Sequence, residues 1–352
     1  MNLKELGFDS YFEANYNTLT DGEFEVGRIA VEHKNIYKVL TEYGEILAEI
    51  SGKMNYKAQG GGDYPAVGDW VLLQIIDQEQ KGIIHGILPR KSKFSRNEAG
   101  DRNKEQIVAA NIDHIFIVNA LNCDFNLRRI ERYLTLVWDS GAKPVIVLNK
   151  ADLCNKLGIE KKLSEVQSVA FGVPIHVISC MDGRGFSELE EYCKVGETIA
   201  LLGSSGVGKS SIINKIYGKE RQSTAEIREG DDKGRHTTTY RELILIPDGG
   251  LIIDTPGMRE IQLWGVGSGI KNTFSDIKKL AQGCKFNDCT HSHEPGCAVK
   301  KAIEKGEITE DRLMSYYKLL REKKYVEMKE KYSADKISKI KWKMLKEGNW
   351  IG

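Results

Sequence analysis

The sequence lacks the features that would mark a membrane or secreted protein. No apolar run approaches the length of a membrane span, and the start, Met1-Asn2-Leu3-Lys4-Glu5, does not resemble a signal peptide. The chain also has almost no net charge, because its 51 Lys and Arg residues are balanced by 50 Asp and Glu residues. Any surface that binds nucleic acid must therefore be local. The sequence contains no coiled-coil repeat that would indicate a dimer. We expect a monomeric cytoplasmic protein that does not bind membranes.

Cysteine is scarce and unevenly placed. Four of the seven cysteines are scattered singly, whereas Cys284, Cys289 and Cys297 lie close together with His291. In a reducing compartment the cluster argues for a metal site and the single cysteines for buried packing. Three thiols and one imidazole form a closed tetrahedral set, which suits a structural Zn²⁺ ion. His293 is a rival ligand, and buried free thiols or a disulfide are the alternative to a metal.

The length of 352 residues suggests two or three domains, and the strand and helix patterns change twice. Residues 1–88 contain short strands at regular spacing, which predicts an OB-type five-stranded barrel. Such barrels often bind RNA, and a barrel that only docks on its neighbour is the alternative. Residues 89–260 alternate apolar strands with helices, which is typical of a parallel sheet covered on both faces. Residues 261–352 are helical and contain the Cys/His cluster. The predicted fold class is therefore multidomain α/β.

Three segments carry basic residues, and each segment either contacts nucleic acid or is a solvated or linking part of the chain. Lys53-Met54-Asn55-Tyr56-Lys57, followed by three glycines, reads as a flexible loop that contacts RNA or is merely solvated. The stretch from Arg90 to Arg96 either touches phosphate or is a linker. The tail from Leu313 mixes lysines with aromatic residues, which fits RNA binding with stacking. A solvated helix face is the usual explanation of such charge runs.

A phosphate-binding loop is the clearest motif in the chain. The pattern G-x-x-x-x-G-K-[ST] is matched by Gly203-Ser204-Ser205-Gly206-Val207-Gly208-Lys209-Ser210, and Ser211 follows. A strand precedes this loop and a helix follows it, so backbone N–H groups should surround phosphate oxygens at the helix N-terminus. We expect Lys209 to bridge the β- and γ-phosphates and the Ser210 hydroxyl to bind Mg²⁺.

A guanine-reading motif, Asn149-Lys150-Ala151-Asp152, follows a buried strand. The Asp152 carboxylate can accept hydrogen bonds from guanine N1–H and N2–H₂, whereas adenine offers neither donor there. Asn149 should brace the loop and meet guanine N7, and the stem of Lys150 should cover the ring. Ser179-Cys180, at the end of the next strand, fits the backbone contact to guanine O6. Asp152 therefore argues for GTP and against a P-loop ATPase.

Asp254-Thr255-Pro256-Gly257 supplies a carboxylate for a water-mediated Mg²⁺ contact and a glycine N–H that senses the γ-phosphate. Met258 follows, where many GTPases place a water-orienting glutamine, and a thioether cannot orient water. Intrinsic hydrolysis should therefore be slow. In the polar segment from Gly230 to Thr239, His236 is the candidate for water positioning, with a solvated loop histidine as the alternative. One of three threonines there should reach Mg²⁺, and Thr238 is our choice.

The order of these motifs is rotated, because the guanine motif precedes the phosphate loop and Asp254 comes last. Together with an OB-like N-terminus and the spacing C-x₄-C-x-H-x₅-C, this order resembles the circularly permuted, small-subunit-dependent GTPases known as RsgA, YjeQ or YloQ. Gly234-Arg235-His236-Thr237-Thr238-Thr239 is similar to that family's switch. Cys284 to Cys297 is similar to its zinc loop, which favours His291 over His293 as a ligand.

The resemblance implies a fold of an OB barrel, a circularly permuted GTPase domain and a helical zinc domain. It further implies a factor that binds the immature small ribosomal subunit and its 16S rRNA, hydrolyses GTP to GDP there, and leaves as the decoding region matures. The subunit would be the activator. The alternative, from a different functional class, is a GTP-gated RNA-binding module in which hydrolysis is incidental.

Overall fold

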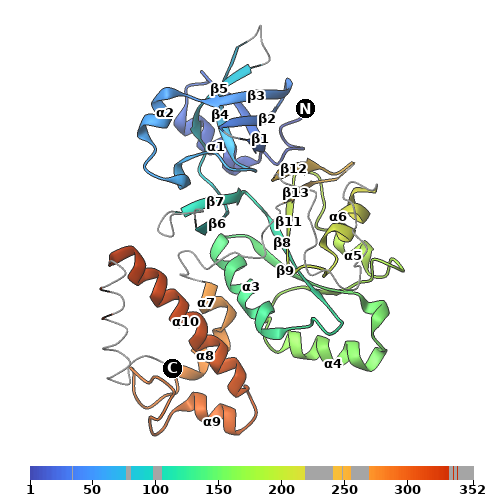
Figure 1. Cartoon of the computed structure of the whole chain (residues 1–352), viewed down its shortest axis with the longest axis vertical. Helices are drawn as coiled ribbons and strands as arrows, with labels where there is room; N and C mark the ends of the chain where they lie inside the picture. The colour runs from blue at the N-terminus through green and yellow to red at the C-terminus, as the bar shows by residue number, and fades with distance from the viewer. Residues whose placement is uncertain are drawn as a thin grey trace. The chain divides into compact units, whose positions relative to one another are not determined.

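The computed structural model describes residues 1–33, 35–76, 81–97, 105–218, 241–247, 249–254, 269–332, 336 and 339. The chain divides into two compact units (Figure 1). The first contains residues 1–125, 140–163 and 173–262, and the second contains residues 126–139, 164–172 and 263–352. No helix in the described part of the chain is both long and apolar enough to cross a membrane.

Five strands near the N-terminus close into a barrel with OB-fold topology. They are β1 (Glu25–His33), β2 (Ile36–Thr41), β3 (Gly44–Ile50), β4 (Trp70–Ile76) and β5 (Lys81–Ile87). Their order is β1-β2-β3-β5-β4, and β4 pairs again with β1 to close the ring. β3 and β5 run parallel, whereas the other pairs are antiparallel. Inward-facing apolar side chains, among them Ile29, Val39 and Leu73, fill the barrel. The predicted OB-type barrel is therefore confirmed.

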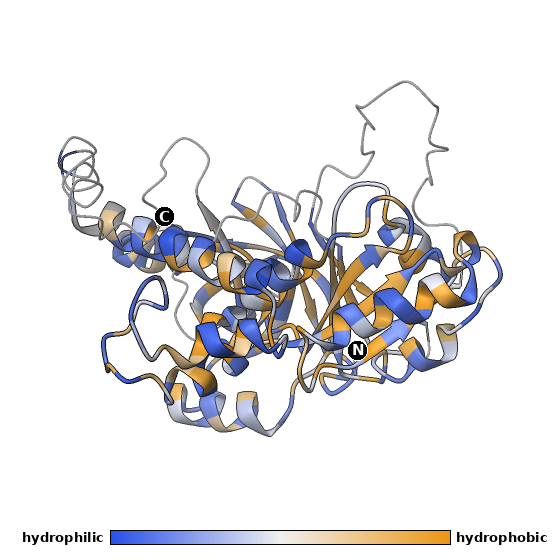
Figure 2. Ribbon diagram, turned by 90° about the horizontal axis from the view of Figure 1, so that it is seen from below, coloured by the Kyte–Doolittle hydropathy of each residue, from blue (hydrophilic) through white to orange (hydrophobic). Residues whose placement is uncertain are grey.

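The second part of the first unit is a largely parallel sheet in the order β10-β9-β8-β11-β13-β12. Its strands are β8 (His114–Ala120), β9 (Lys143–Asn149), β10 (Ile175–Val177), β11 (Thr198–Leu202), β12 (Glu242–Leu245) and β13 (Leu251–Asp254). Only β12 is antiparallel to its neighbour in this sheet. Hydrophobic residues concentrate on the strands (Figure 2), as expected where both faces are covered. Helices and turns α4 (Lys156–Gln167), α5 (Phe186–Glu190), α6 (Lys209–Tyr217) and η2 (Ala151–Leu153) connect these strands.

The barrel and the parallel sheet are continuous, because Val31 of β1 pairs with Glu242 of β12. Arg28, which is fully buried, donates to Leu6 O, Gly68 O and, at 2.9 Å, to Asn111 O just before β8. Burial lowers the pKa of Arg28 to about 10, so the guanidinium is still charged at neutral pH. One buried side chain therefore joins the N-terminal segment, the barrel and the first strand of the sheet.

The structure corrects two expectations about the first unit. The segment read as a flexible loop forms the short helix α2 (Gly52–Lys57) and the turn η1 (Gly61–Asp63). The basic stretch belongs to a hairpin of β6 (Lys93–Asn97) and β7 (Glu105–Ala110), and Lys93 Nζ pairs with Glu105. Arg90 forms two bonds of 2.7 Å with buried Asp69. Arg90 is therefore held inside the fold and a plain linker does not describe this stretch, whereas the Lys93 side chain is 51% exposed and a phosphate contact stays a prediction.

The second unit is helical. It contains α3 (Leu127–Ser140) up to Asp139, together with α7 (Gly269–Thr273), α8 (Ser275–Ala281), α9 (Ala298–Glu304) and α10 (Glu310–Lys331). A buried ionic cluster holds three of these helices. Arg312 of α10 donates to Glu131 of α3 at 2.7 Å and to Asp276 of α8 at 2.6 and 2.8 Å. The remaining helix, α1 (Ser10–Leu19), belongs to the first unit and begins at the N-cap residue Asp9.

Candidate functional site

The predicted motifs meet at one edge of the parallel sheet. β10, β9, β8, β11 and β13 are parallel, so their carboxyl ends share an edge. This edge carries Asn149 at the end of β9, Ser179 after β10, Gly203 after β11 and Asp254 at the end of β13. Ligands bind at such edges in open α/β sheets. The structure therefore brings together residues that lie up to about a hundred positions apart in the chain.

The guanine motif follows β9 in a tight turn. Lys150 has the left-handed conformation, with φ 65° and ψ 39°, and it caps η2. Ala151 is buried, and its N–H donates to Ile178 O at 3.1 Å, which joins the turn to the end of β10. The Asp152 side chain is exposed, as a carboxylate that recognises a ligand must be before the ligand covers it.

Ser179 holds Asp152 in place. Its Oγ donates to Asp152 Oδ1 at 2.7 Å and accepts from Met181 N at 3.2 Å and Asp182 N at 3.3 Å. The hydroxyl is thus fully used, and it orders the turn that presents the backbone N–H of Cys180. Burial raises the pKa of the Cys180 thiol, so this group stays protonated and neutral beside the motif. The side chain of Ser179 therefore positions the carboxylate, a role that the sequence did not predict.

The phosphate loop has the backbone conformation that its glycines were expected to provide. Gly206 and Gly208 have φ values of 74° and 101°, and Gly208 is the N-cap of α6. Buried Val207 anchors the loop in the core of the sheet. Lys209 Nζ donates to Gly203 O at 2.8 Å and to Ser204 O at 2.7 Å. The ammonium group therefore lies against the carbonyl groups at the start of the loop.

Asn149 connects the guanine motif to the phosphate loop. Its Nδ2 donates to Val207 O at 2.8 Å. The two motifs pack so closely here that a Cβ atom added at Gly208 would lie 2.3 Å from Asn149 Nδ2. The expectation that Asn149 braces the loop thus corresponds to a specific bond.

The predicted Mg²⁺ ligands lie partly within the described residues. Ser210 occupies the first turn of α6, and Asp254 ends β13, the strand beside β11. A hydroxyl and a carboxylate are the hard oxygen donors that Mg²⁺ prefers. His236, Thr238, Gly257 and Met258 lie outside the described residues.

One polar contact at this edge was missed from the sequence. Asp124 lies in the turn after β8, and its Oδ2 accepts from Ser204 Oγ at 2.8 Å. The turn is closed by bonds from Asp124 N to Asn122 Oδ1 and from Phe125 N to Asn122 O. The signal was available, because Asn122 and Asp124 follow a buried strand as the recognised motifs do.

The second site is the Cys/His cluster, whose donor atoms all lie within 4.8 Å of one another. His291 Nδ1 lies 3.6 Å from Cys284 Sγ and 3.5 Å from Cys297 Sγ, and the two sulfur atoms are 3.9 Å apart. Tetrahedral Zn²⁺ with bonds of about 2.3 Å to sulfur and about 2.0 Å to nitrogen places such atoms roughly 3.5–3.8 Å apart. The three thiols and one imidazole therefore fit zinc in both chemistry and spacing.

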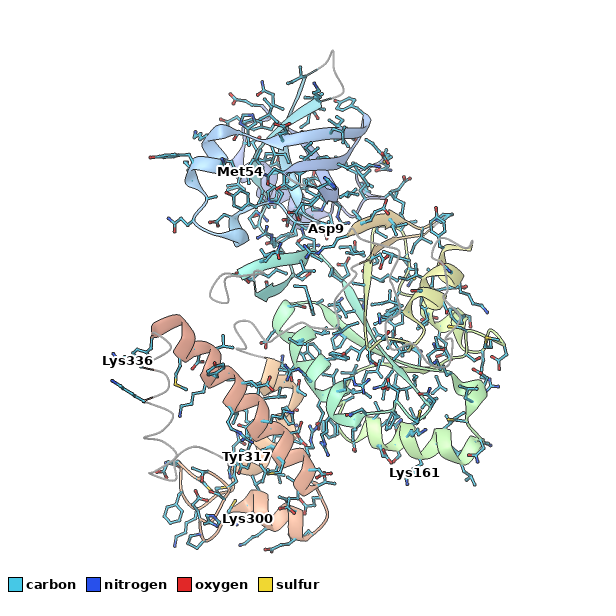
Figure 3. The ribbon with its side chains drawn as sticks, viewed as in Figure 1. Asp9, Met54, Lys161, Lys300, Tyr317 and Lys336 are labelled. Carbon is cyan, nitrogen blue, oxygen red and sulfur yellow. The ribbon has the colours of Figure 1, made fainter. Side chains whose placement is uncertain are left out.

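The loop around this cluster is built to hold its donors. His291 is buried and has φ 62°, whereas His293 is exposed. Glu294 accepts from the N–H groups of Thr290, Ser292 and His293. The hydroxyl of Tyr317, labelled on α10 in Figure 3, donates to Thr290 O at 2.6 Å. The loop is thereby fixed to α10.

Comparisons with known proteins identify relatives over most of the chain. A family model described as RsgA GTPase matches residues 87–264. The small ribosomal subunit biogenesis GTPase RsgA 2 of Lactiplantibacillus plantarum is 48% identical over 92% of this chain and 90% of its own length. The RsgA of Opitutus terrae is 41% identical over 99% of this chain and 97% of its own length.

Solved structures are similar as well. The crystal structure of YjeQ from Thermotoga maritima has a TM-score of 0.63 and 29% identity, covering 85% of this chain and 98% of that one. YloQ, described as a circularly permuted GTPase, has a TM-score of 0.62 and 26% identity, covering 87% of this chain and 97% of that one.

Proposed function

Since this chain belongs to the RsgA GTPase family, we propose that it binds the small ribosomal subunit during late maturation and hydrolyses GTP there, with the subunit as activator. The relatives named above are small ribosomal subunit biogenesis GTPases. The proposed partners are the cytoplasmic subunit and its 16S rRNA, and the protein acts as a monomer. The three proposed domains are the barrel (residues 1–88), the GTPase domain (89–260) and the zinc domain with its basic tail (261–352).

In the proposed site, Asp152 pairs with guanine N1–H and N2–H₂, and the Cys180 N–H meets guanine O6. Asn149 meets N7, and Lys150 covers the ring. Support comes from the bond of Ser179 Oγ to Asp152, which aims the carboxylate before the base arrives. A preformed carboxylate left unpaired by adenine is what makes such a site selective.

The proposed phosphate site uses the backbone N–H groups of the loop from Gly203 to Ser211. Lys209 moves from its carbonyl partners to the β- and γ-phosphates. Mg²⁺, when bound, neutralises phosphate charge, and Ser210, Thr238 and Asp254 are its proposed ligands. Gly257 is proposed to sense the γ-phosphate, and His236 to position the attacking water. Since Met258 cannot perform that last task, the reaction depends on His236 or on the subunit.

The zinc site is proposed to be structural. Cys284, Cys289, His291 and Cys297 fill all four positions of a tetrahedral ion, which leaves no place for substrate. The zinc ion would keep the loop rigid where the surrounding core is small. The lysine-rich helices beside it are the proposed contact with rRNA phosphates.

The bond between Asn149 and Val207 O is the observation that carries the proposed GTPase site, because it joins base recognition to phosphate binding. The test is GTP turnover with and without purified small subunits. We expect slow intrinsic turnover and a rate at least about ten-fold higher with subunits. Large subunits serve as the control. Equal turnover in all three reactions would exclude a subunit-activated enzyme.

The competing proposal is a GTP-gated RNA-binding module in which hydrolysis is incidental. Co-sedimentation with small subunits separates the two, using a non-hydrolysable GTP analogue and then GDP. A factor that leaves after hydrolysis binds with the analogue and dissociates with GDP. Nucleotide-dependent binding without any stimulated turnover would instead favour the module.

A further inference from the structure

The segment from Leu121 to Phe125 contacts both halves of the proposed nucleotide site. Leu121 N donates to Asn149 O at 2.8 Å, and Leu121 O accepts from Lys162 Nζ at 2.5 Å. At the other end of the segment, Asp124 Oδ2 accepts from Ser204 Oγ in the phosphate loop. This five-residue turn therefore bonds to the strand of the guanine motif and to the phosphate loop at once.

Asp124 has few ways to move independently of this turn. Its N–H is held by Asn122 Oδ1 at 3.0 Å, and the next N–H, from Phe125, is held by Asn122 O at 3.2 Å. Lys162 Nζ lies 5.6 Å from the centre of the Phe125 ring. A shift of Ser204 that keeps this bond therefore displaces the turn with it.

The chain enters the second unit directly after Phe125, and α3 begins at Leu127. Inside that unit α3 is tightly held. The Glu131 side chain is fully buried, and Arg312, with 3% of its side chain exposed, donates to it. Arg312 also donates to Thr273 O and to Asp276. Buried, fully paired charges of this kind resist separation, so α3 moves with α8 and α10.

We propose that Asp124 is a positioning residue that makes α3 respond to nucleotide binding. In the structure, Lys209 Nζ bonds to Gly203 O and Ser204 O, the carbonyl groups around the residue that Asp124 holds. When nucleotide is bound to a phosphate loop, the lysine ammonium group binds phosphate oxygens. Lys209 would then no longer bond to the two carbonyl groups. Ser204 then shifts against Asp124, and the turn passes the change along the chain to α3. The inference rests on the proposed nucleotide site.

The test is hydrogen–deuterium exchange of the full-length protein, without nucleotide and with saturating GDP. In the wild type we expect GDP to slow exchange in residues 121–140 by about five-fold or more. Asp124→Ala and Ser204→Ala should reduce this response to less than about two-fold. Asp124→Asn keeps an acceptor for Ser204 and should retain the response. Ser187→Ala, which changes an exposed serine of α5 outside the phosphate loop, is the control and should also retain it. Barrel residues 36–50 serve as the internal reference.

Each outcome decides the matter. Loss of the response in Asp124→Ala and Ser204→Ala alone supports the proposal. A full response in Asp124→Ala, no response in the wild type, or equal loss in Ser187→Ala overturns it. GDP affinity, measured on the same samples by fluorescence of a labelled nucleotide, separates this failure from a failure of the site. A wild-type chain that binds no GDP overturns the nucleotide site and the inference together.

Discussion

Asp152 is the residue on which the proposed choice of base depends. Replacing it with Asn keeps the shape and the bond from Ser179, but turns an acceptor pair into one acceptor and one donor. We expect GTP affinity to fall by about 100-fold or more, because one bond is lost and the other no longer has a charged acceptor. Xanthosine triphosphate carries a carbonyl where guanine carries N2–H₂, so its affinity should rise in the same variant. Competition titrations with both nucleotides measure this, and unchanged GTP preference would refute the assignment.

Gly208 is required for two separable reasons. Its φ of +101° is unfavourable for other residues, and a Cβ would lie 2.3 Å from Asn149 Nδ2. We expect Gly208→Ala to weaken GTP binding by about ten-fold or more, since the clash breaks the brace between the two motifs. Gly218 isolates the first reason, because its φ is +76° with no atom within 4 Å of an added Cβ. Gly218→Ala should cost about 1–2 kcal/mol of stability and leave GTP affinity near the wild-type value. Equal loss of affinity in both variants would contradict the role of the brace.

The zinc loop is the element whose folding depends most on its ligands. Cys297 is the N-cap of α9, and its Sγ accepts from Lys300 N, so metal binding and helix formation share one residue. We predict that His291→Ala loses the bound zinc and lowers the melting temperature, because binding of structural zinc is part of the folding free energy. His293→Ala is the matched control and should retain one zinc per chain. Elemental analysis and thermal melting decide between the two histidines, and zinc loss in the control alone would reverse the assignment.

Elements with a strong hydrophobic pattern were predictable, and those that depend on distant partners were not. β9 is buried along nearly its whole length and reads as a central strand from sequence alone. β6 has no such pattern, and Lys93 at its start pairs with Glu105 of β7. The basic stretch was ambiguous for the same reason. A sequence shows that Arg90 is basic but not that Asp69, about twenty residues earlier, lies buried beside it.

At the scale of the whole molecule, motif residues were predictable because their spacing reflects ligand chemistry. The residues that support them were not. The sequence does not indicate that the Ser179 hydroxyl holds Asp152, and although Asp124 follows a buried strand, it does not show that Asp124 meets Ser204 about eighty positions away. Such contacts arise from which strands become neighbours. The grouping of α3 with the C-terminal helices is of the same kind, since it depends on the buried pair of Glu131 and Arg312.

The continuity of barrel and parallel sheet leads to the last prediction. Arg28 is buried at their junction and donates to three carbonyl groups, those of Leu6, Gly68 and Asn111. Arg28→Ala removes the donor to Leu6 O and Asn111 O, whereas Gly68 O keeps its bond from Asn111 Nδ2, and the loss should cost about 2–4 kcal/mol. Because the barrel and the sheet share this side chain, both should lose stability together in calorimetry.

Lys38→Ala is the matched control for Arg28→Ala. It also removes a basic side chain from a barrel strand, but Lys38 pairs with Glu45 at the surface, with 39% and 52% of the two side chains exposed. Exposed pairs contribute about 0–1 kcal/mol, so melting should hardly change. Arg28→Ala could instead lower the stability of the barrel and leave the GTPase sheet at its wild-type melting temperature. The barrel and the sheet would then fold independently, and the prediction would be wrong.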